Sequence, residues 1–101
     1  MGRIQGLAES GILSENQIVK SLPGYVFSIT LAYAGAAAGN RCYLRDGILG
    51  NSPIEVVFIL DAAQGTMHFD WPQGKEFTSG IYWDQGDAVG SDKIFATMTY
   101  K

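Results

Sequence analysis

The side chains that could carry catalysis or bind a metal ion are few and scattered in this sequence. His68 is the only histidine and Cys42 the only cysteine, whereas a structural zinc site gathers four such ligands. A catalytic serine or cysteine needs a histidine base within hydrogen-bond reach, and the pattern around His68 indicates no serine or cysteine partner. His68 stands between Met67 and Phe69, which predicts that it faces solvent or a subunit boundary. We expect no enzyme, no catalytic residue, no metal and no cofactor.

One cluster of carboxylates is a further candidate for a metal site. Asp84, Asp87 and Asp92 fall within one short, glycine-containing turn, and calcium prefers such oxygen ligands. Their spacing fits no established calcium loop. Aspartate is also common in turns because its carboxylate accepts hydrogen bonds from nearby backbone amides. We favour this local role over a calcium site.

The elements that must position these side chains are β-strands, because apolar and polar residues alternate from Tyr25 onward. Six segments carry this alternation or a continuous apolar run, and a seventh strand is expected at residues 17–22. The six are Tyr25–Tyr33, Arg41–Asp46, Glu55–Leu60, Thr66–Trp71, Phe77–Trp83 and Lys93–Tyr100. No segment supplies the crossover helix of about ten residues or more that a parallel sheet needs. The sequence predicts an all-β fold, a single-domain antiparallel β-sandwich of jelly-roll type.

The same alternation predicts which side chains are buried. Cys42 and Leu44 should point inward, Cys42 as a small buried strand residue. Pro72 and Gly74 should form the corner between two core strands. The large side chains expected to share the core faces of the strands are Phe27, Ile29, Leu31, Tyr33, Phe69, Trp71, Phe77 and Ile81.

The first sixteen residues differ in character from the rest. Glycines interrupt them, yet they contain four large apolar residues: Ile4, Leu7, Ile12 and Leu13. Such a segment is either a loosely ordered terminus or an arm that folds onto a neighbouring molecule. We predict an extended N-terminal arm over residues 1–16 and the β-sandwich domain over residues 17–101, and we assign the four apolar residues to a protein interface.

Composition excludes several partners. The 101 residues suffice for one domain with a modest core, and the net charge of −3 with seven scattered Lys and Arg argues against nucleic acid. The N-terminus lacks the apolar stretch of a signal peptide. No segment approaches the roughly 20 apolar residues that cross a bilayer. We expect no signal peptide and no membrane partner, with assembly in a cytoplasm.

Aromatic residues are the stronger clue to function. Tyr43, Tyr82 and Trp83, with Trp71 and Tyr100, exceed what one small core easily holds. Surplus aromatics on a β-sandwich indicate a subunit or partner interface, and we assign Tyr43, Tyr82 and Trp83 to one. Two alternatives remain open. An exposed aromatic platform could stack on sugar rings, or these side chains could simply fill the sandwich.

Four segments together resemble a known family. They are PGYVFSIT at residues 23–30, RCYLRDG at 41–47, HFDWPQGKEFTSGIY at 68–82 and FATMTY at 95–100. This series is similar to small jelly-roll structural proteins of tailed bacteriophages, of the capsid decoration (cement) type. The likeness covers residues 23–101, and it departs from the family at Trp71, where phenylalanine commonly precedes the proline.

The resemblance implies a non-enzymatic structural protein of the virion. Such a protein binds the head surface as an oligomer, here a homotrimer, and stabilises subunit junctions, so its partners are the major capsid protein and copies of itself. The N-terminal arm would then order on a neighbouring subunit. The main alternative is a host-surface or glycan-binding module of a phage tail fibre or knob. A small lyase or isomerase is a third class, against which the shortage of histidine and paired carboxylates counts.

Overall fold

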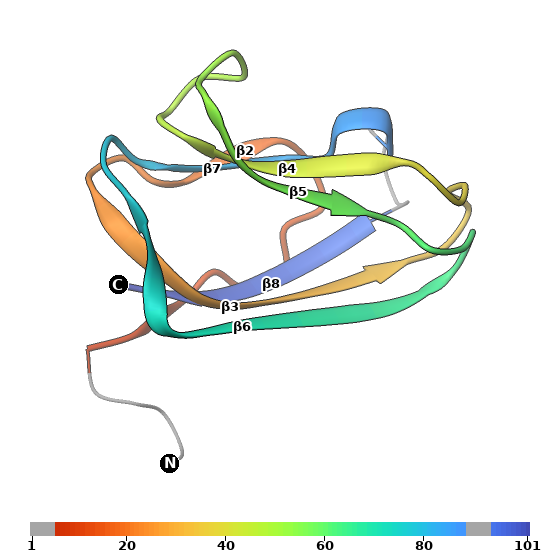
Figure 1. Cartoon of the computed structure of the whole chain (residues 1–101), viewed down its shortest axis with the longest axis horizontal. Helices are drawn as coiled ribbons and strands as arrows, with labels where there is room; N and C mark the ends of the chain where they lie inside the picture. The colour runs from red at the N-terminus through yellow and green to blue at the C-terminus, as the bar shows by residue number, and fades with distance from the viewer. Residues whose placement is uncertain (1–5, 89–93) are drawn as a thin grey trace.

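The structure, a computed structural model, describes residues 6–88 and 94–101 and consists of two four-stranded antiparallel sheets packed face to face (Figure 1). One sheet has the strand order β1-β8-β3-β6 and the other β2-β7-β4-β5. The strands are β1 (Ala8–Glu9), β2 (Gln17–Lys20), β3 (Gly24–Tyr33), β4 (Arg41–Asp46), β5 (Ile54–Ile59), β6 (Gly65–Phe77), β7 (Ile81–Asp84) and β8 (Ile94–Tyr100), and a short 3₁₀ helix, η1, spans Gly86–Ala88.

The order of the strands identifies the topology. β1 pairs with β8, β2 with β7, β3 with β6 and β4 with β5, all antiparallel. The first strand thus pairs with the last, the second with the next to last, and so on inward. This is the order produced when one long hairpin of paired strands wraps into two sheets, the jelly roll. The predicted all-β, single-domain antiparallel sandwich of jelly-roll type is confirmed.

The core lies between the two sheets and is built by alternate residues of each strand. Cys42 and Leu44 of β4 are buried as predicted, and burial raises the pKa of the Cys42 thiol to about 12, with smaller contributions from nearby Asp84 and Asp87. Phe77 and Ile81 are fully buried, whereas Phe69 and Trp71 are partly buried and pack against the core. The other fully buried large side chains are Trp83, Ile29, Leu31, Leu60, Ile94, Gln85 and Val26.

The alternation fails at one place in β3. The pairing with β6 passes from Val26↔Lys75 directly to Ser28↔Asp70, which leaves Phe27 and residues 71–74 in a bulge. Val26 is completely buried there, while Phe27 is only partly buried. The prediction that Phe27 shares the core face with Ile29 is therefore wrong, because the bulge shifts the pattern by one residue.

The prediction that Pro72 and Gly74 form a corner between two strands is wrong, because both residues lie in the bulge, within a single strand. β6 is one strand that bends there and pairs with β3 on both sides of the bend (Figure 1). Proline has no N–H for a ladder, so it suits a bulge in an edge strand. Gly74 adopts a φ of 84°, a backbone conformation that favours glycine.

The true turn between β6 and β7 spans residues 78–80, and Asp46 fixes it. The Asp46 carboxylate accepts hydrogen bonds from the Thr78 and Ser79 backbone amides at 3.0 and 2.7 Å and from the Thr78 hydroxyl at 2.9 Å. Desolvation alone would raise the pKa of Asp46, but these hydrogen bonds outweigh it, and the pKa lies below its usual value.

The described part of the N-terminal segment packs against its own chain. β1 pairs with β8, and Leu13 exchanges backbone hydrogen bonds with Ala96 at 2.8 and 2.9 Å. The Leu13 side chain is 2% exposed and belongs to the core. Residues 6–16 thus cover one side of the sandwich, while Ile4 lies outside the described residues.

Candidate functional site

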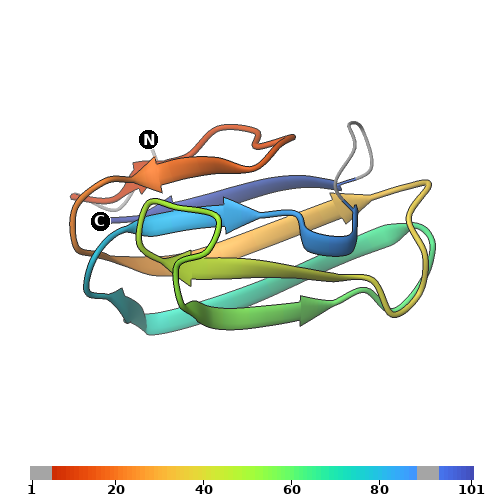
Figure 2. The same ribbon diagram turned by 90° about the horizontal axis from the view of Figure 1, so that it is seen from above.

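The sheet β2-β7-β4-β5, whose backbone Figure 2 shows from above, carries exposed apolar and half-buried aromatic side chains on its outer face. Val57 pairs across strands with Tyr43, and Ile18 with Tyr82. Val57 is 48% and Ile59 57% exposed. Together with Leu49 of the β4–β5 loop, these side chains form what we call the apolar face: Ile18, Tyr43, Leu49, Val57, Ile59 and Tyr82. Apolar side chains gathered on an outer face of a sheet mark an interaction surface.

The charged residues of this face are engaged with one another. The Arg45 Nε donates to the Asp84 carboxylate at 2.7 Å, and Nη1 donates to the Ser52 carbonyl at 2.7 Å. The guanidinium carbon lies 5.4 Å from the centre of the Tyr43 ring, within the range of a cation–π contact. Asp84 also accepts a hydrogen bond from the Gly86 amide at 2.7 Å. The pair therefore presents little free charge and ties the β4–β5 loop down onto the sheet.

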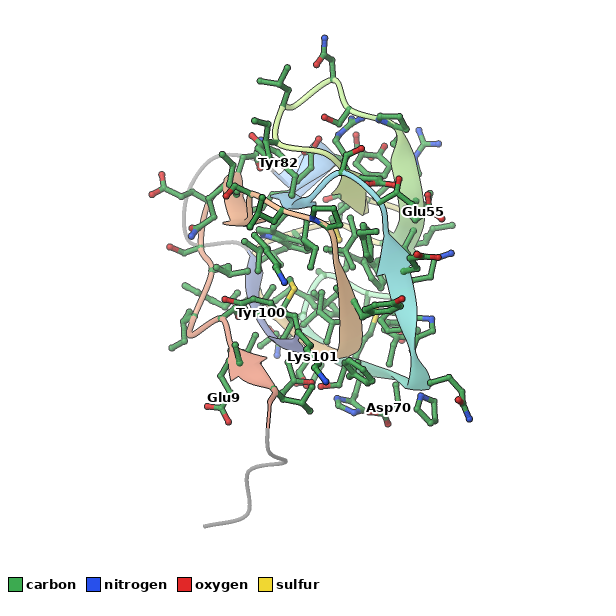
Figure 3. The ribbon with its side chains drawn as sticks, turned by 90° about the vertical axis from the view of Figure 1, so that its left-hand side faces the viewer. Glu9, Glu55, Asp70, Tyr82, Tyr100 and Lys101 are labelled. Carbon is green, nitrogen blue, oxygen red and sulfur yellow. The ribbon has the colours of Figure 1, made fainter. Side chains whose placement is uncertain are left out.

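This loop stands over the sheet beside Tyr82 (Figure 3). A Cβ atom at Gly50 would lie 3.8 Å from the Tyr82 hydroxyl, so loop and tyrosine are in near contact. Ser52 accepts a hydrogen bond from the Leu49 amide at 3.1 Å through its hydroxyl and donates one from its own amide to the Leu49 carbonyl at 3.0 Å. These bonds hold the loop in a fixed shape, and Leu49 is 60% exposed on it.

β5 is an open edge of the same sheet. Within the described residues it pairs with β4 alone. Edge strands of monomeric proteins are usually blunted by lysine or proline, and Ile54–Ile59 contains neither. Its one charged residue, Glu55, is paired with Lys75 of β6 at 2.9 Å. β5 therefore offers both unpaired backbone groups and exposed aliphatic side chains.

The outer face of the other sheet is polar and carries a chain of side-chain contacts. The Thr30 hydroxyl lies 2.7 Å from His68 Nδ1, and His68 Nε2 lies 2.9 Å from Asp70 Oδ1. Beside them, the Ser28 and Thr99 hydroxyls share a hydrogen bond of 2.7 Å. His68 lies on the outer face of the sheet, which agrees with the prediction that it faces solvent or a subunit boundary. Sequence analysis missed its hydroxyl partner, because Thr30 reaches it across strands.

A hydroxyl, an imidazole and a carboxylate in line are the groups of a serine-hydrolase relay. Catalysis of that kind also needs free amide donors for the developing oxyanion. β3, which carries Thr30, is paired on both sides, to β6 and β8, so its amides are used in the ladders. The Thr30–His68 and Ser28–Thr99 contacts each join two neighbouring strands, and such cross-strand pairs stabilise a sheet.

The residues that sequence analysis assigned to an interface lie partly at the surface and partly in the core. Tyr43 and Tyr82 are half-buried on the apolar face. Trp83 is completely buried, because β7 points Ile81 and Trp83 inward, and Leu13 is also in the core. Neither reaches the surface of the single chain. Ile12 is 72% exposed, and Leu7 is half-buried. The apolar side chains that sequence analysis missed are those of β2, the β4–β5 loop and β5.

Of the carboxylate cluster, Asp84 has the local role in its turn that we favoured, whereas Asp87 contacts β4. Asp84 caps the Gly86 amide, and Asp87 accepts a hydrogen bond from the Arg41 amide at 3.0 Å. Asp92 lies outside the described residues. Over residues 6–88 and 94–101, no group of three or more histidine, cysteine or acidic side chains is placed to hold a metal ion.

Comparison with known proteins gave no match to a family model, a curated protein or a solved structure. The likeness to phage decoration proteins thus stays a prediction from the four sequence segments. In the part of the chain that the structure describes, we found no helix of the length and apolar character needed to span a membrane.

Proposed function

We propose that this chain is a structural protein of a bacteriophage virion, a capsid decoration protein that binds the head surface as an oligomer. The observation that carries the proposal is the apolar face next to the open edge of β5. Exposed Val57 and Ile59 lie on β5, which pairs with β4 on one side and with no other strand of the described residues on the other side. Burying these groups against protein would remove apolar surface from water and pair the free backbone.

In this role the protein clamps junctions between capsid subunits. Copies of the chain contact one another, as a homotrimer, and contact the major capsid protein. Each contact needs only a modest area because neighbouring copies on a lattice add avidity. The fixed loop over Tyr82 and the internally satisfied Arg45–Asp84 pair suit a surface that binds without rearrangement.

The proposal is tested with one substitution on the apolar face and one control. Val57→Lys places a charge on the exposed face of β5, and Thr66→Lys places the same charge on β6, in the other sheet, where Thr66 is also exposed. Sedimentation velocity measures oligomeric state, and co-sedimentation with heads of the encoding phage measures binding. Circular dichroism checks that both variants keep the fold.

We expect the unchanged chain and Thr66→Lys to be oligomeric and to bind heads, whereas Val57→Lys is monomeric and stays in the supernatant. A monomeric unchanged chain that leaves heads uncoated would overturn the proposal. If Val57→Lys and Thr66→Lys had the same oligomeric state and bound heads equally, the apolar face would not be the binding surface.

A further inference from the structure

A hollow of about 460 Å³ lies at one end of the sandwich, outside the apolar face. It is formed where the start of β3, the bend of β6 and the ends of β2 and β8 meet. Its lining includes Lys20, Tyr25, Phe27, Gln73 and Lys101. Lys101 is labelled at this end of the molecule in Figure 3. The volume falls within the roughly 300–1,000 Å³ typical of small-molecule sites.

The bulge in β3 creates the apolar floor of this hollow. Val26 turns into the core, so Tyr25 and Phe27 on either side of it both line the hollow. Their ring centres are 6.5 Å apart with an angle of 46° between the planes. Both rings rest on Gly74, where a Cβ atom would come within 3.0 Å of Phe27 and 3.1 Å of Tyr25. Because Gly74 has no side chain, both rings can pack closely against its backbone.

The rim of the hollow supplies hydrogen-bond donors that are not already used. Among the residues that the structure describes, the side chains of Lys20, Gln73 and Lys101 make no hydrogen bond or ion pair. Lys75 shows the contrast, since it is paired with Glu55 at 2.9 Å. No acidic side chain lines the hollow, although the chain as a whole carries a net charge of −3.

We propose that this hollow binds a saccharide. A pyranose ring presents C–H groups on its face, which pack on aromatic rings, and oxygen atoms at its edge, which accept hydrogen bonds. Tyr25 and Phe27 match the ring face, because an aromatic side chain offers a broad apolar surface. Lys20, Gln73 and Lys101 match the edge, where hydroxyl or carboxylate oxygens of the sugar accept their N–H groups.

This inference does not rest on the decoration role. The hollow uses the β2–β3 turn, the bend of β6 and the end of β8, whereas the apolar face centres on β4, β5 and β7. A protein on a virion could use both surfaces together. The Val57→Lys variant therefore separates the two proposals, because it should lose assembly and keep saccharide binding.

The first experiment applies the full chain to a printed array of neutral and uronic-acid-containing oligosaccharides. The oligosaccharide with the strongest signal is then titrated by isothermal calorimetry. We expect Tyr25→Ala and Phe27→Ala each to weaken binding about tenfold, the effect of losing one aromatic contact. Phe95→Ala is the matched control, because Phe95 is 38% exposed on β8 away from the hollow, and it should bind unchanged.

Gly74→Ala tests the geometry without touching the ligand. The added methyl group displaces both rings, so this variant should also weaken binding, with the fold checked by circular dichroism. Binding to none of the oligosaccharides would overturn the proposal. So would an oligosaccharide that binds Tyr25→Ala and Phe27→Ala as tightly as the unchanged chain.

Discussion

Removing the charge of either Arg45 or Asp84 should destabilise the protein far more than removing one charge of an exposed ion pair would. Their side chains are only 16% and 11% exposed, and the Arg45 Nε and Asp84 Oδ2 atoms are 2.7 Å apart. Asp84→Asn keeps the size of the side chain and the oxygen that caps Gly86, but removes the negative charge. Arg45→Met keeps most of the length and apolar volume but removes the guanidinium and its bond to the Ser52 carbonyl.

The magnitude follows from the burial of the pair. Removing one partner leaves the other as an uncompensated charge with little access to water, which costs about 3 kcal/mol at the low end for buried pairs. Two independent losses of that size would sum to about 6 kcal/mol, whereas the double variant leaves no unpaired charge and should fall short of that sum by about 3 kcal/mol, the upper end of the coupling between residues in contact. The coupling is therefore about 3 kcal/mol, well above the roughly 0–1 kcal/mol of an exposed pair.

Urea denaturation of the four proteins at pH 7, followed by tryptophan fluorescence, measures these free energies of unfolding. A domain of this size has about 5–15 kcal/mol of stability in total, so the single variants should still fold at 25 °C. Raising the salt concentration should change the coupling little, because a buried pair is weakly screened. Additive effects within about 0.5 kcal/mol would show that the two residues do not interact, and would refute the reasoning.

Three further predictions concern the core and one turn. Asp46→Asn should lower the free energy of unfolding by about 2 kcal/mol at pH 7. Because the pKa of Asp46 is lowered in the folded protein, the stabilisation by its carboxylate is complete above the ordinary pKa of about 3.9 and is lost as pH falls through the folded pKa. Urea denaturation should therefore give the two proteins the same free energy of unfolding in acid. The Cys42 thiol, with a pKa raised to about 12, should resist iodoacetamide at pH 8 until urea unfolds the chain, and labelling of the native protein, read by mass spectrometry, would contradict its burial. Leu13→Ala should cost about 3 kcal/mol as a cavity in the core, and a change below about 0.5 kcal/mol in thermal or urea unfolding would mean that residues 6–16 do not belong to the folded unit.

Sequence analysis succeeded where a strand alternates without interruption. β4 has the predicted bounds, and Cys42 and Leu44 point inward. Period two is enough in such a strand, because one buried face determines every side chain. The fold class followed from several strands of this kind joined by short turns.

Longer-range features could not be predicted from local pattern. The segment read as an arm contains β1 and the core residue Leu13, but its glycines hide the strand, and only its pairing with β8 reveals it. Thr30 and His68 meet because β3 and β6 are adjacent, a fact of topology that lies in neither segment alone. Trp83 was assigned to an interface on its size, whereas its place on the inward face of β7 buries it.

The bulge at Phe27 shows why a local failure of pattern can mark a site. Regular alternation through β3 would place Phe27 between the sheets, and β6 would pair straight through residues 71–74. The observed pairing skips these residues, so Val26 fills the core and Phe27 is left beside Tyr25 at the surface. Val26 already fills this part of the core, so the core does not require the rings of Tyr25 and Phe27. Gly74 beneath them leaves room for both rings, and bulges are over-represented next to active sites, where they re-aim a side chain. The departure from period two and the proposed saccharide site are thus consequences of one structural feature.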